Sequence, residues 1–169
     1  MRLLVLAVLL AGCSAQQQPA PAPAGLPVPA GAQEATVVRL VDGDTVQLRG
    51  RGAGPLRAEP TRVRLLLIDT PEVHPEPECF GGEASDRAAE LLPDGSTVHV
   101  LADREPRDRF GRALLHVWNA DGVHVGQALV REGLAEVLFL RPNDRYLDQL
   151  ETAEREARRA SRGLWSACR

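Results

Sequence analysis

The sequence predicts an α+β fold, in which a small barrel of five strands carries about three helices. Two patterns indicate it: short β-branched runs bounded by turn residues, and longer stretches in which apolar residues recur at helical spacing. The chain has 169 residues, of which 44% are apolar and 25% charged, and this fits one folded domain plus a preceding segment.

The strands are bounded by turn signals. An Asp42-Gly43 pair separates two β-branched runs, and this dipeptide is a strong signal for a hairpin. The third run ends at Thr70-Pro71, because proline cannot donate a hydrogen bond to a sheet and the residue before it avoids helix. The expected strands cover residues 36–41, 44–48, 61–68, 97–101 and 112–118.

Three helices are expected between and after these strands. Residues 82–92 and 125–131 have helical spacing, and Gly133 follows the second of them. The last helix is expected to begin after Asn143 or Asp144 as N-cap, with an apolar face made of Leu147, Leu150, Ala153, Ala157 and Ala160. Five strands with interspersed helices are typical of a Greek-key barrel of the OB type.

The N-terminus has the pattern of an export signal. Residues 1–13 contain Arg2, an apolar run too short to span a bilayer, and Cys13 in a stretch that resembles a bacterial lipobox. We therefore expect acylation of Cys13 and a protein held in the cell envelope, or outside the cell, by this lipid anchor alone. Cleavage as a plain signal peptide is the alternative. Residues 14–33 carry no charge and are rich in Ala, Pro and Gln, so they are expected to form a disordered tether before a domain at 34–169.

The three cysteines agree with export. If Cys13 carries lipid, Cys79 and Cys168 remain as an even pair, and an oxidising compartment favours a disulfide between them. Closing a loop of this length stabilises a fold by roughly 4–5 kcal/mol in the chain-entropy model. Two unrelated free thiols are the alternative.

The charge balance argues against a protein that coats nucleic acid without specificity. The net charge is −3 and the pI is near 5.8, whereas such proteins are usually basic. An enzyme that binds one phosphate in a local pocket needs no global positive charge. All 20 basic residues are arginine, so any phosphate contact would come from a guanidinium, which can bind bidentately.

One charged residue stands inside an apolar run. Arg64 interrupts Val63–Ile68, and a charge in a buried strand is costly unless it is paired. Its partner is either a carboxylate of this chain or a phosphate of a ligand. Other segments are ambiguous by themselves: residues 42–45 could be only a hairpin turn, and 108–112 only a charged turn before a strand.

Taken together, these segments resemble the staphylococcal nuclease (thermonuclease) family. The resemblance rests on Asp-Gly-Asp-Thr at 42–45, Val-Arg-Leu-Leu-Leu-Ile-Asp-Thr-Pro-Glu at 63–72 and Asp-Arg-Phe-Gly-Arg at 108–112. The segments 128–135 and 163–166 fit the same family, so the resemblance runs from about residue 35 to 165.

The resemblance implies a Ca²⁺ site and a catalytic set. Asp44 and Asp69 would bind the ion through carboxylates, with the carbonyl of Thr70 beside them, and hard oxygen ligands suit a hard divalent ion. The catalytic residues would be a general base and two phosphate-binding arginines, namely Glu72, Arg64 and Arg112. Arg64 and Asp69 are five residues apart, so strict strand alternation would place them on opposite faces, and their convergence requires a bulge or turn.

The implied activity is calcium-dependent hydrolysis of DNA and RNA, with single strands favoured and 3′-phosphate products, by a monomer. Phe110 and Phe139 stand where the family has tyrosines around the nucleotide; they keep the stacking surface and lose the hydroxyl. The loop after Glu72 carries prolines, and His74 within it is expected to be exposed to solvent. The arginines at 155, 158, 159 and 162 are expected to be a solvated helix face.

Two other functions are compatible with the sequence. An OB-type module that binds nucleic acid without catalysis would explain the net negative charge and the two phenylalanines. An envelope protein that acts through its tether would explain only the N-terminus. The presence of Glu72 beside both arginines favours the enzyme, because a binding module gains nothing from a lone base.

Overall fold

The computed structural model describes residues 25–168. The signal segment 1–13 with its lipidation site Cys13, and the tether up to residue 24, lie outside the described residues. Among the residues that are described, no helix has the length and apolar character needed to cross a membrane.

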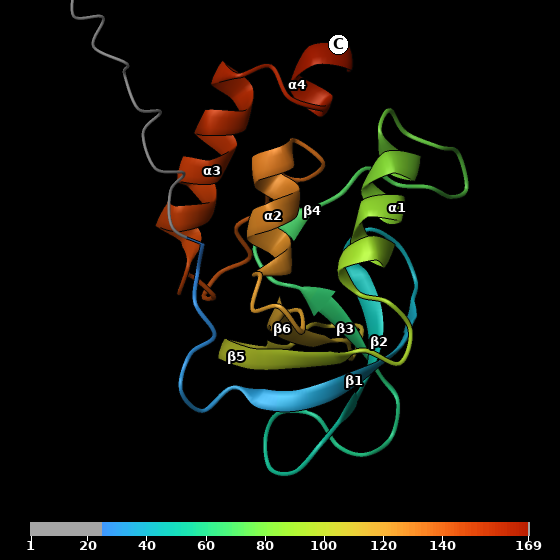
Figure 1. The fold of residues 1–169 in the computed structure, drawn as a ribbon, viewed down its shortest axis with the longest axis vertical. Coiled ribbons are helices and arrows are strands. Elements are labelled where there is room, and N and C mark those ends of the chain that lie inside the picture. The colour runs from blue at the N-terminus through green and yellow to red at the C-terminus, as the bar shows by residue number, and fades with distance from the viewer. Residues whose placement is uncertain (1–24, 169) are drawn as a thin grey trace, which may run out of the picture.

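Five strands form a closed barrel in the order β1-β2-β3-β6-β5 (Figure 1). Neighbouring strands are antiparallel except β3 and β6, which are parallel. The strands are β1 (Gln33–Leu40), β2 (Thr45–Gly50), β3 (Thr61–Leu65), β5 (Thr97–Arg107) and β6 (Ala113–Trp118). This architecture confirms the expected α+β barrel of the OB type.

The barrel interior follows from the alternation of apolar residues along each strand. Val37, Val46, Val63, Val98 and Val117 are all at most 1% exposed, and they come from five different strands. The hairpin expected at Asp42-Gly43 joins β1 to β2, where Val41 N–H donates to Thr45 O at 2.9 Å.

The third expected strand, residues 61–68, is interrupted, so that prediction is wrong in its length. β3 ends at Leu65, a turn occupies residues 66–67, and β4 (Ile68–Asp69) pairs with β7 (Glu136–Val137) instead of the barrel. Leu67 has a φ of 66°, a conformation that costs a residue with a side chain roughly 1–2 kcal/mol. Burial of Leu67, only 1% exposed, offsets this cost.

β5 continues well beyond its expected end at residue 101. Its pairing with β6 shifts between Ala102 and Arg107, so the second half of β5 leaves the regular ladder and forms an arm. The arm ends in the turn at residues 108–111, which returns the chain to β6.

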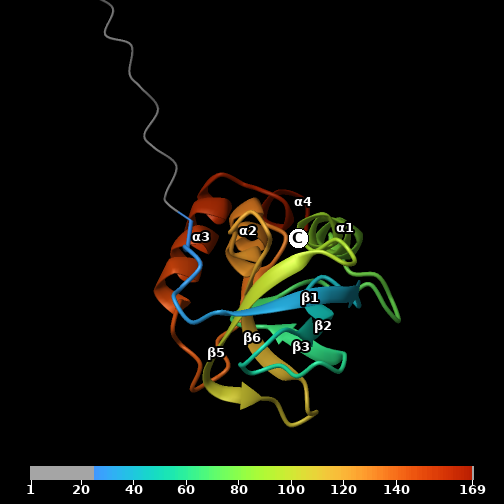
Figure 2. The same ribbon diagram turned by 60° about the horizontal axis from the view of Figure 1, so that its bottom comes forward.

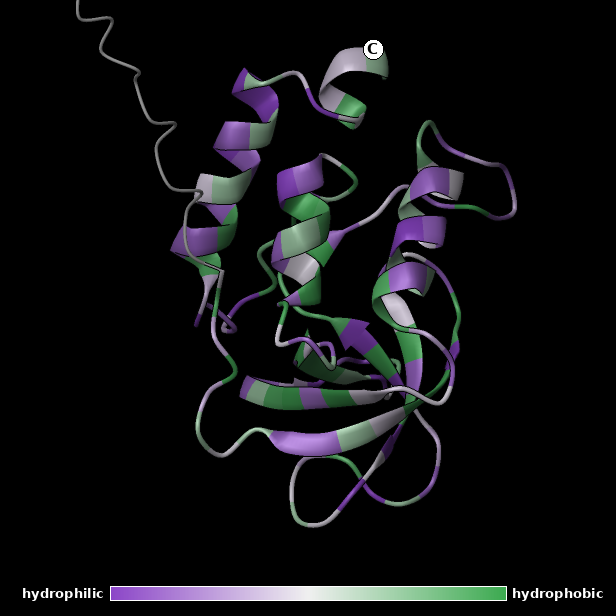
Figure 3. Ribbon diagram, viewed as in Figure 1, coloured by the Kyte–Doolittle hydropathy of each residue, from purple (hydrophilic) through white to green (hydrophobic). Residues whose placement is uncertain are grey.

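The three expected helices are α1 (Gly81–Leu91), α2 (Val125–Glu132) and α3 (Leu147–Arg159), and a short α4 (Leu164–Ala167) was not expected. They lie on one side of the barrel, with α2 between α1 and α3 (Figures 1 and 2). Figure 3 shows both hydrophobic and hydrophilic segments on α2 and mostly hydrophilic ones on α3, in agreement with a central and a peripheral position.

The expected N-cap of the last helix is wrong. The residue at the N-cap is Tyr146, and Asn143 is buried elsewhere. Its side chain accepts a hydrogen bond from Glu105 N–H at 2.8 Å and donates one to Glu105 O at 3.1 Å. Asn143 therefore fixes the β5 arm to the segment before α3.

The folded part of the chain begins before residue 34, the boundary expected from composition. Leu26 is buried, its N–H donates to Gln127 Oε1 at 3.0 Å, and its carbonyl accepts from Trp118 Nε1 at 2.8 Å. A segment without charge thus packs against the domain because its backbone satisfies two buried side chains.

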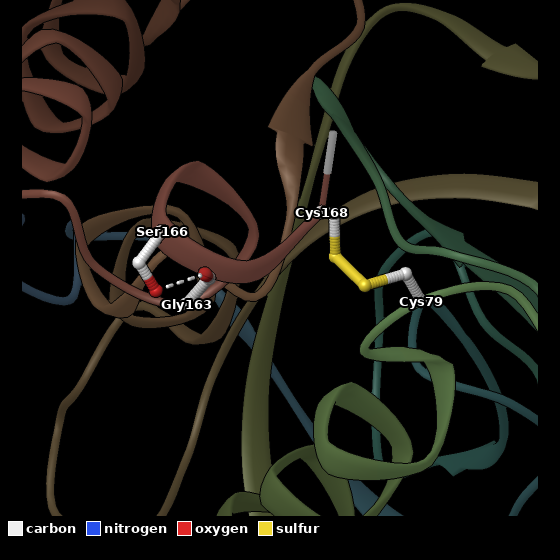
Figure 4. Close-up of a disulfide and its surroundings, with 4 residues drawn as sticks. All are labelled: Cys79, Gly163, Ser166 and Cys168. Atoms are coloured by element: carbon white, nitrogen blue, oxygen red, sulfur yellow. Dashed lines mark hydrogen bonds between the residues drawn. A yellow bond between two sulfur atoms is a disulfide. The ribbon is translucent and has the colours of Figure 1, made fainter.

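The expected disulfide between Cys79 and Cys168 is present, with 5.8 Å between the Cα atoms (Figure 4). It joins the segment before α1 to the residue after α4. Gly133 and Gly163 bring the end of α2 next to the start of α4. Leu164 N–H donates to Gly133 O at 2.9 Å, and a Cβ on either glycine would collide with the backbone of the other segment.

Candidate functional site

A cleft of about 610 Å³ opens beside the barrel, between the β3–β4 turn, the β5 arm and the segment before α3. It collects arginines, carboxylates and a few apolar side chains from parts of the chain that are distant in sequence. Its lining residues are Arg64, Asp69, Glu72, Glu105, Arg107, Asp108, Arg109, Phe110, Arg112, Leu114, Leu138, Leu140, Arg141 and Asn143.

Arg64 lies at the inner end of this cleft and binds two carboxylates. Its Nη1 pairs with Asp44 Oδ1, and its Nη2 donates to Asp69 Oδ1 at 2.5 Å and to Ile68 O at 3.0 Å. The sequence left open a carboxylate or a phosphate as the partner of Arg64, and in this structure the partners are carboxylates. Arg64 and Asp69 meet because the turn at residues 66–67 ends the strand alternation between them.

Asp44 is fixed from several sides. Its Oδ1 accepts from Thr45 Oγ1 at 3.1 Å and its Oδ2 accepts from Thr70 N–H at 3.1 Å. Gly43 permits this approach, because a Cβ at that position would lie 2.6 Å from Thr70 Oγ1. The Asp-Gly-Asp-Thr motif therefore serves both as a hairpin turn and as a support for the buried carboxylate.

Burial governs the protonation of Asp44. Burial raises its pKa to about 6, with a further contribution from Asp42, while the Arg64 guanidinium and the Thr70 N–H oppose the rise. A buried carboxylate that a single guanidinium compensates only in part favours an additional positive charge nearby.

Glu72 lines the outer part of the cleft and is exposed. Its backbone is held by Glu78: Glu72 N–H donates to Glu78 Oε2 and Glu78 N–H donates to Glu72 O, both at 2.9 Å. Gly81 lies against the same carbonyl, since a Cβ there would approach Glu72 O to 2.5 Å. The loop after Pro71 is thus pinned close to the disulfide at Cys79.

Arg112 enters the cleft from the start of β6 and is oriented by Asp108. Its Nε donates to Asp108 Oδ2 at 2.6 Å, while the Phe110 and Arg112 N–H groups both donate to Asp108 Oδ1 at 2.9 Å. Partial burial would raise the pKa of Asp108, but the hydrogen bonds from Arg112 outweigh it and lower that pKa. Among the described residues, no ion pair involves Nη1 or Nη2 of Arg112, so both can reach a ligand.

The two phenylalanines differ in position. Phe110 is 69% exposed at the tip of the β5–β6 turn and lines the cleft. The Arg109 guanidinium lies 4.7 Å from its ring centre and that of Arg112 lies 5.7 Å away. Phe139 is also exposed, but it is not among the lining residues, and its neighbours Leu138 and Leu140 line the cleft instead. The structure therefore brings Phe110 to the site and leaves Phe139 at its edge.

Several residues that line the site have no role predicted from the sequence. Asp108 orients Arg112, and Arg107, Arg109 and Arg141 add positive charge to the walls. The role of Asp108 could have been predicted from its spacing, because it lies four residues before Arg112 in a turn that contains Gly111. Arg107, Arg109 and Arg141 come together through long-range packing of the β5 arm, and no local sequence pattern predicts that arrangement. His74 is exposed, as expected, and lies in a neighbouring hollow with Asp42 and Glu72.

The oxygen atoms near Arg64 fit a hard divalent cation. Asp44 and Asp69 both bind the Arg64 guanidinium, and Thr70, which follows Asp69 in the chain, donates its N–H to Asp44. Within residues 25–168 no group of three or more His, Cys, Asp or Glu side chains could hold a metal ion. The available donors are therefore two carboxylates and backbone oxygen, which suit a hard cation and leave several ligand positions for water or substrate.

The closed barrel, with a cleft lined by arginines, carboxylates and apolar side chains beside it, defines a protein of the OB-fold class. Residues 62–167 match the sequence profile described as staphylococcal nuclease homologue, so the chain belongs to the staphylococcal nuclease family. The match covers β3 from Arg62 onward, the helices α1 to α4 and every residue that lines the cleft.

Relatives of known name are similar over most of this chain. The SPbeta prophage-derived endonuclease YokF of Bacillus subtilis is 36% identical over 79% of this chain and 44% of its own length. Endonuclease YncB of the same organism is 36% identical over 78% of this chain and 61% of its own. The thermonuclease of Staphylococcus intermedius is 36% identical over 76% of this chain and 74% of its own length. The chain thus spans only about half the length of the two Bacillus relatives.

Proposed function

We propose that this protein is a calcium-dependent nuclease that hydrolyses phosphodiester bonds of DNA and RNA, prefers single strands and leaves 3′-phosphate products. One observation carries the proposal: Arg64, Asp69, Glu72 and Arg112, from three separate segments, line one cleft. The relatives named endonuclease and thermonuclease support it.

Each residue has a chemical role in this proposal. Glu72, exposed on a pinned backbone, accepts the proton of the attacking water. Arg112, with its Nη atoms directed by Asp108, binds the scissile phosphate, and Arg64 binds it from the inner end of the cleft. Both guanidinium groups stabilise the negative charge that grows on the phosphoryl oxygens in the transition state. Phe110 offers a face on which a base of a single strand stacks.

Calcium would be held by the carboxylates of Asp44 and Asp69 with the carbonyl of Thr70. When bound, it supplies Lewis-acid polarisation of a phosphoryl oxygen and positive charge near the buried Asp44. Thr45 and Thr70 keep the Asp44 carboxylate in place by their hydrogen bonds.

We place the protein in the cell envelope or outside the cell, as a monomer held by a lipid on Cys13. The apolar run before Cys13 supports export, and the disulfide between Cys79 and Cys168 suits an oxidising compartment. Mass spectrometry of the membrane fraction would test the anchor: a diacylated Cys13 is expected, and a mature chain that starts elsewhere contradicts it.

The enzyme is tested with the purified full chain and single-stranded DNA. We expect cleavage with calcium, no cleavage with excess EGTA, and a turnover reduced about 10²–10⁴-fold in Glu72→Ala. Glu76→Ala is the matched control, because Glu76 is an exposed residue of the same loop outside the cleft. Near-normal turnover in Glu72→Ala would show that the assigned base is wrong.

A binding module without catalysis is the second candidate. The net charge of −3 and the phenylalanine at position 110 favour it. A folded chain that binds single-stranded DNA but releases no product with calcium would establish this function instead.

A further inference from the structure

Phe110 lines two clefts. One is the cleft of the candidate site, and a second of about 580 Å³ lies where the β5–β6 turn meets the start of β3. The second cleft is lined by Pro60, Thr61, Arg62, Phe110, Gly111 and Arg112. Phe110 and Arg112 line both clefts, so an extended ligand can pass from one to the other over the exposed ring.

Arg62 lines the second cleft but not the first. It lies on β3 two residues before Arg64, so the two side chains leave the same face of the strand about 7 Å apart along it. Arg64 is buried and paired with carboxylates, whereas Arg62 is exposed and takes part in none of the ion pairs among residues 25–168. Its guanidinium is therefore available to an anion.

We propose that Arg62, together with Phe110 and Arg112, forms a second subsite that binds the phosphate next to the scissile one in a single-stranded polynucleotide. This inference rests on the proposed nuclease function. A strand whose scissile phosphate lies between Arg64 and Arg112 continues over Phe110, where a base stacks, and its next phosphate reaches Arg62. The planar guanidinium suits a phosphate because it can donate two parallel hydrogen bonds.

Other arginines of the chain are less suitable for this role. On α3, Arg155 pairs with Glu151 at 3.6 Å and Arg158 pairs with Glu154 at 3.4 Å. The Arg158 guanidinium also lies 3.7 Å from the centre of the Trp165 ring. These contacts agree with a solvated helix face, and α3 lies on the helical side of the molecule, away from β3 (Figure 1).

The subsite is tested by binding of fluorescent single-stranded DNA of about six nucleotides and of a dinucleotide, by anisotropy in excess EGTA. Arg62→Gln in the full chain should weaken binding of the longer probe about tenfold, as expected for a lost charged hydrogen bond. The loss should be smaller for the dinucleotide. The slope of log affinity against log salt should fall by about 0.7, the value for one phosphate contact on a single strand.

Arg159→Gln is the control, because Arg159 is an exposed arginine of α3. It should bind both probes as the unaltered chain does. Arg62→Glu should weaken the longer probe further, and since residue 62 is exposed both variants should retain the circular dichroism of the fold. Equal affinity and equal salt slope in Arg62→Gln and Arg159→Gln would overturn the subsite. Because this assay needs no turnover, its outcome is separate from a failure of the proposed hydrolysis.

Discussion

Of two buried polar clusters in this protein, one contains charged side chains and the other contains neutral ones. At the cleft, Arg64 and Asp44 are buried, and the carboxylates of Asp44 and Asp69 compensate the charge of the guanidinium. The second cluster, called here the aromatic cluster, comprises His116, Trp118, His124 and Tyr146, whose rings pack edge to face. It excludes charge.

The hydrogen bonds of the aromatic cluster indicate which nitrogen of neutral His124 carries its proton. His124 Nδ1 accepts from Gln127 N–H at 3.0 Å, so the proton of neutral His124 is on Nε2, which lies 3.4 Å from His116 Nδ1. Burial, with the charge of Arg145, lowers the pKa of His116 to about 3. Burial, with the charge of His116, lowers the pKa of His124 to about 3.

The difference teaches that burial alone does not decide whether a group carries charge. A guanidinium keeps its proton at any physiological pH, so the fold must provide carboxylates for it. An imidazole can lose its second proton, and the fold leaves it neutral where no carboxylate is near. The cleft thus keeps charged groups beside an open surface, while the aromatic cluster contributes only packing.

The largest expected effect comes from removing the charge at the centre of the cleft. Arg64→Met leaves the buried Asp44 without its partner, and breaking a buried pair typically costs about 3–5 kcal/mol. Urea unfolding should show this loss, and nuclease activity should fall below detection. Arg62→Met, on the same strand but exposed, is the control for stability. An Arg64→Met chain as stable as the control would mean that Asp44 needs no compensation.

The disulfide should have the next largest effect. Cys79→Ser with Cys168→Ser should lower the free energy of unfolding by about 4 kcal/mol, because the unfolded chain is no longer closed into a loop. The loop that carries Glu72 ends at Cys79, so kcat should fall more than KM rises. Urea unfolding and steady-state kinetics measure the two effects. A loss of stability with unchanged kcat would show that the Glu78 hydrogen bonds hold Glu72 by themselves.

The aromatic cluster should make stability depend on pH. An unfolded histidine binds a proton near pH 6.5 and the folded ones only near pH 3, so between these values the unfolded chain binds more protons. Stability is therefore complete above pH 6.5 and is lost as the pH falls, by up to about 1.4 kcal/mol per pH unit for each histidine.

This pH dependence is best measured against a matched variant. Asp44, whose pKa is raised, contributes with the opposite sign, and this contribution is common to the unaltered chain and to His116→Gln with His124→Gln. Urea unfolding at pH 7.5, 6.5 and 5.5 should give a steeper loss for the unaltered chain, by about 2–3 kcal/mol at pH 5.5. Parallel curves would contradict the assignment of neutral histidines.

The smallest effect is expected where the N-terminal segment covers the aromatic cluster. Leu26→Ala should cost about 2 kcal/mol, the lower end for a buried leucine, because Leu26 lies at the margin of the core. The hydrogen bond from the Trp118 side-chain Nε1–H to the backbone carbonyl of Leu26 is retained in this variant, so thermal unfolding reports side-chain burial alone. Leu140→Ala, an exposed leucine, should leave the melting temperature unchanged.

The sequence by itself determined the barrel strands, the Asp-Gly hairpin, the three main helices, the cysteine pair and the motifs of the cleft. These features depend on short-range rules: alternation, helical spacing, turn residues and the cost of a charge inside an apolar run. The spacing of Arg64 and Asp69 also indicated that a turn must lie between them, although not where.

Only the tertiary structure decided how distant segments meet. The turn at Leu67 depends on burial of its side chain, which compensates an unfavourable φ. The position of the β5 arm and the displacement of Asn143 from its expected cap depend on a contact between residues more than 35 positions apart. The same holds for Leu26, whose uncharged neighbours suggested a tether and whose backbone instead bonds to Gln127 and Trp118. Local sequence determines which secondary structure each segment prefers. Packing decides which of these preferences the fold keeps, because a buried polar group needs a hydrogen-bond partner, and that partner can be distant in sequence.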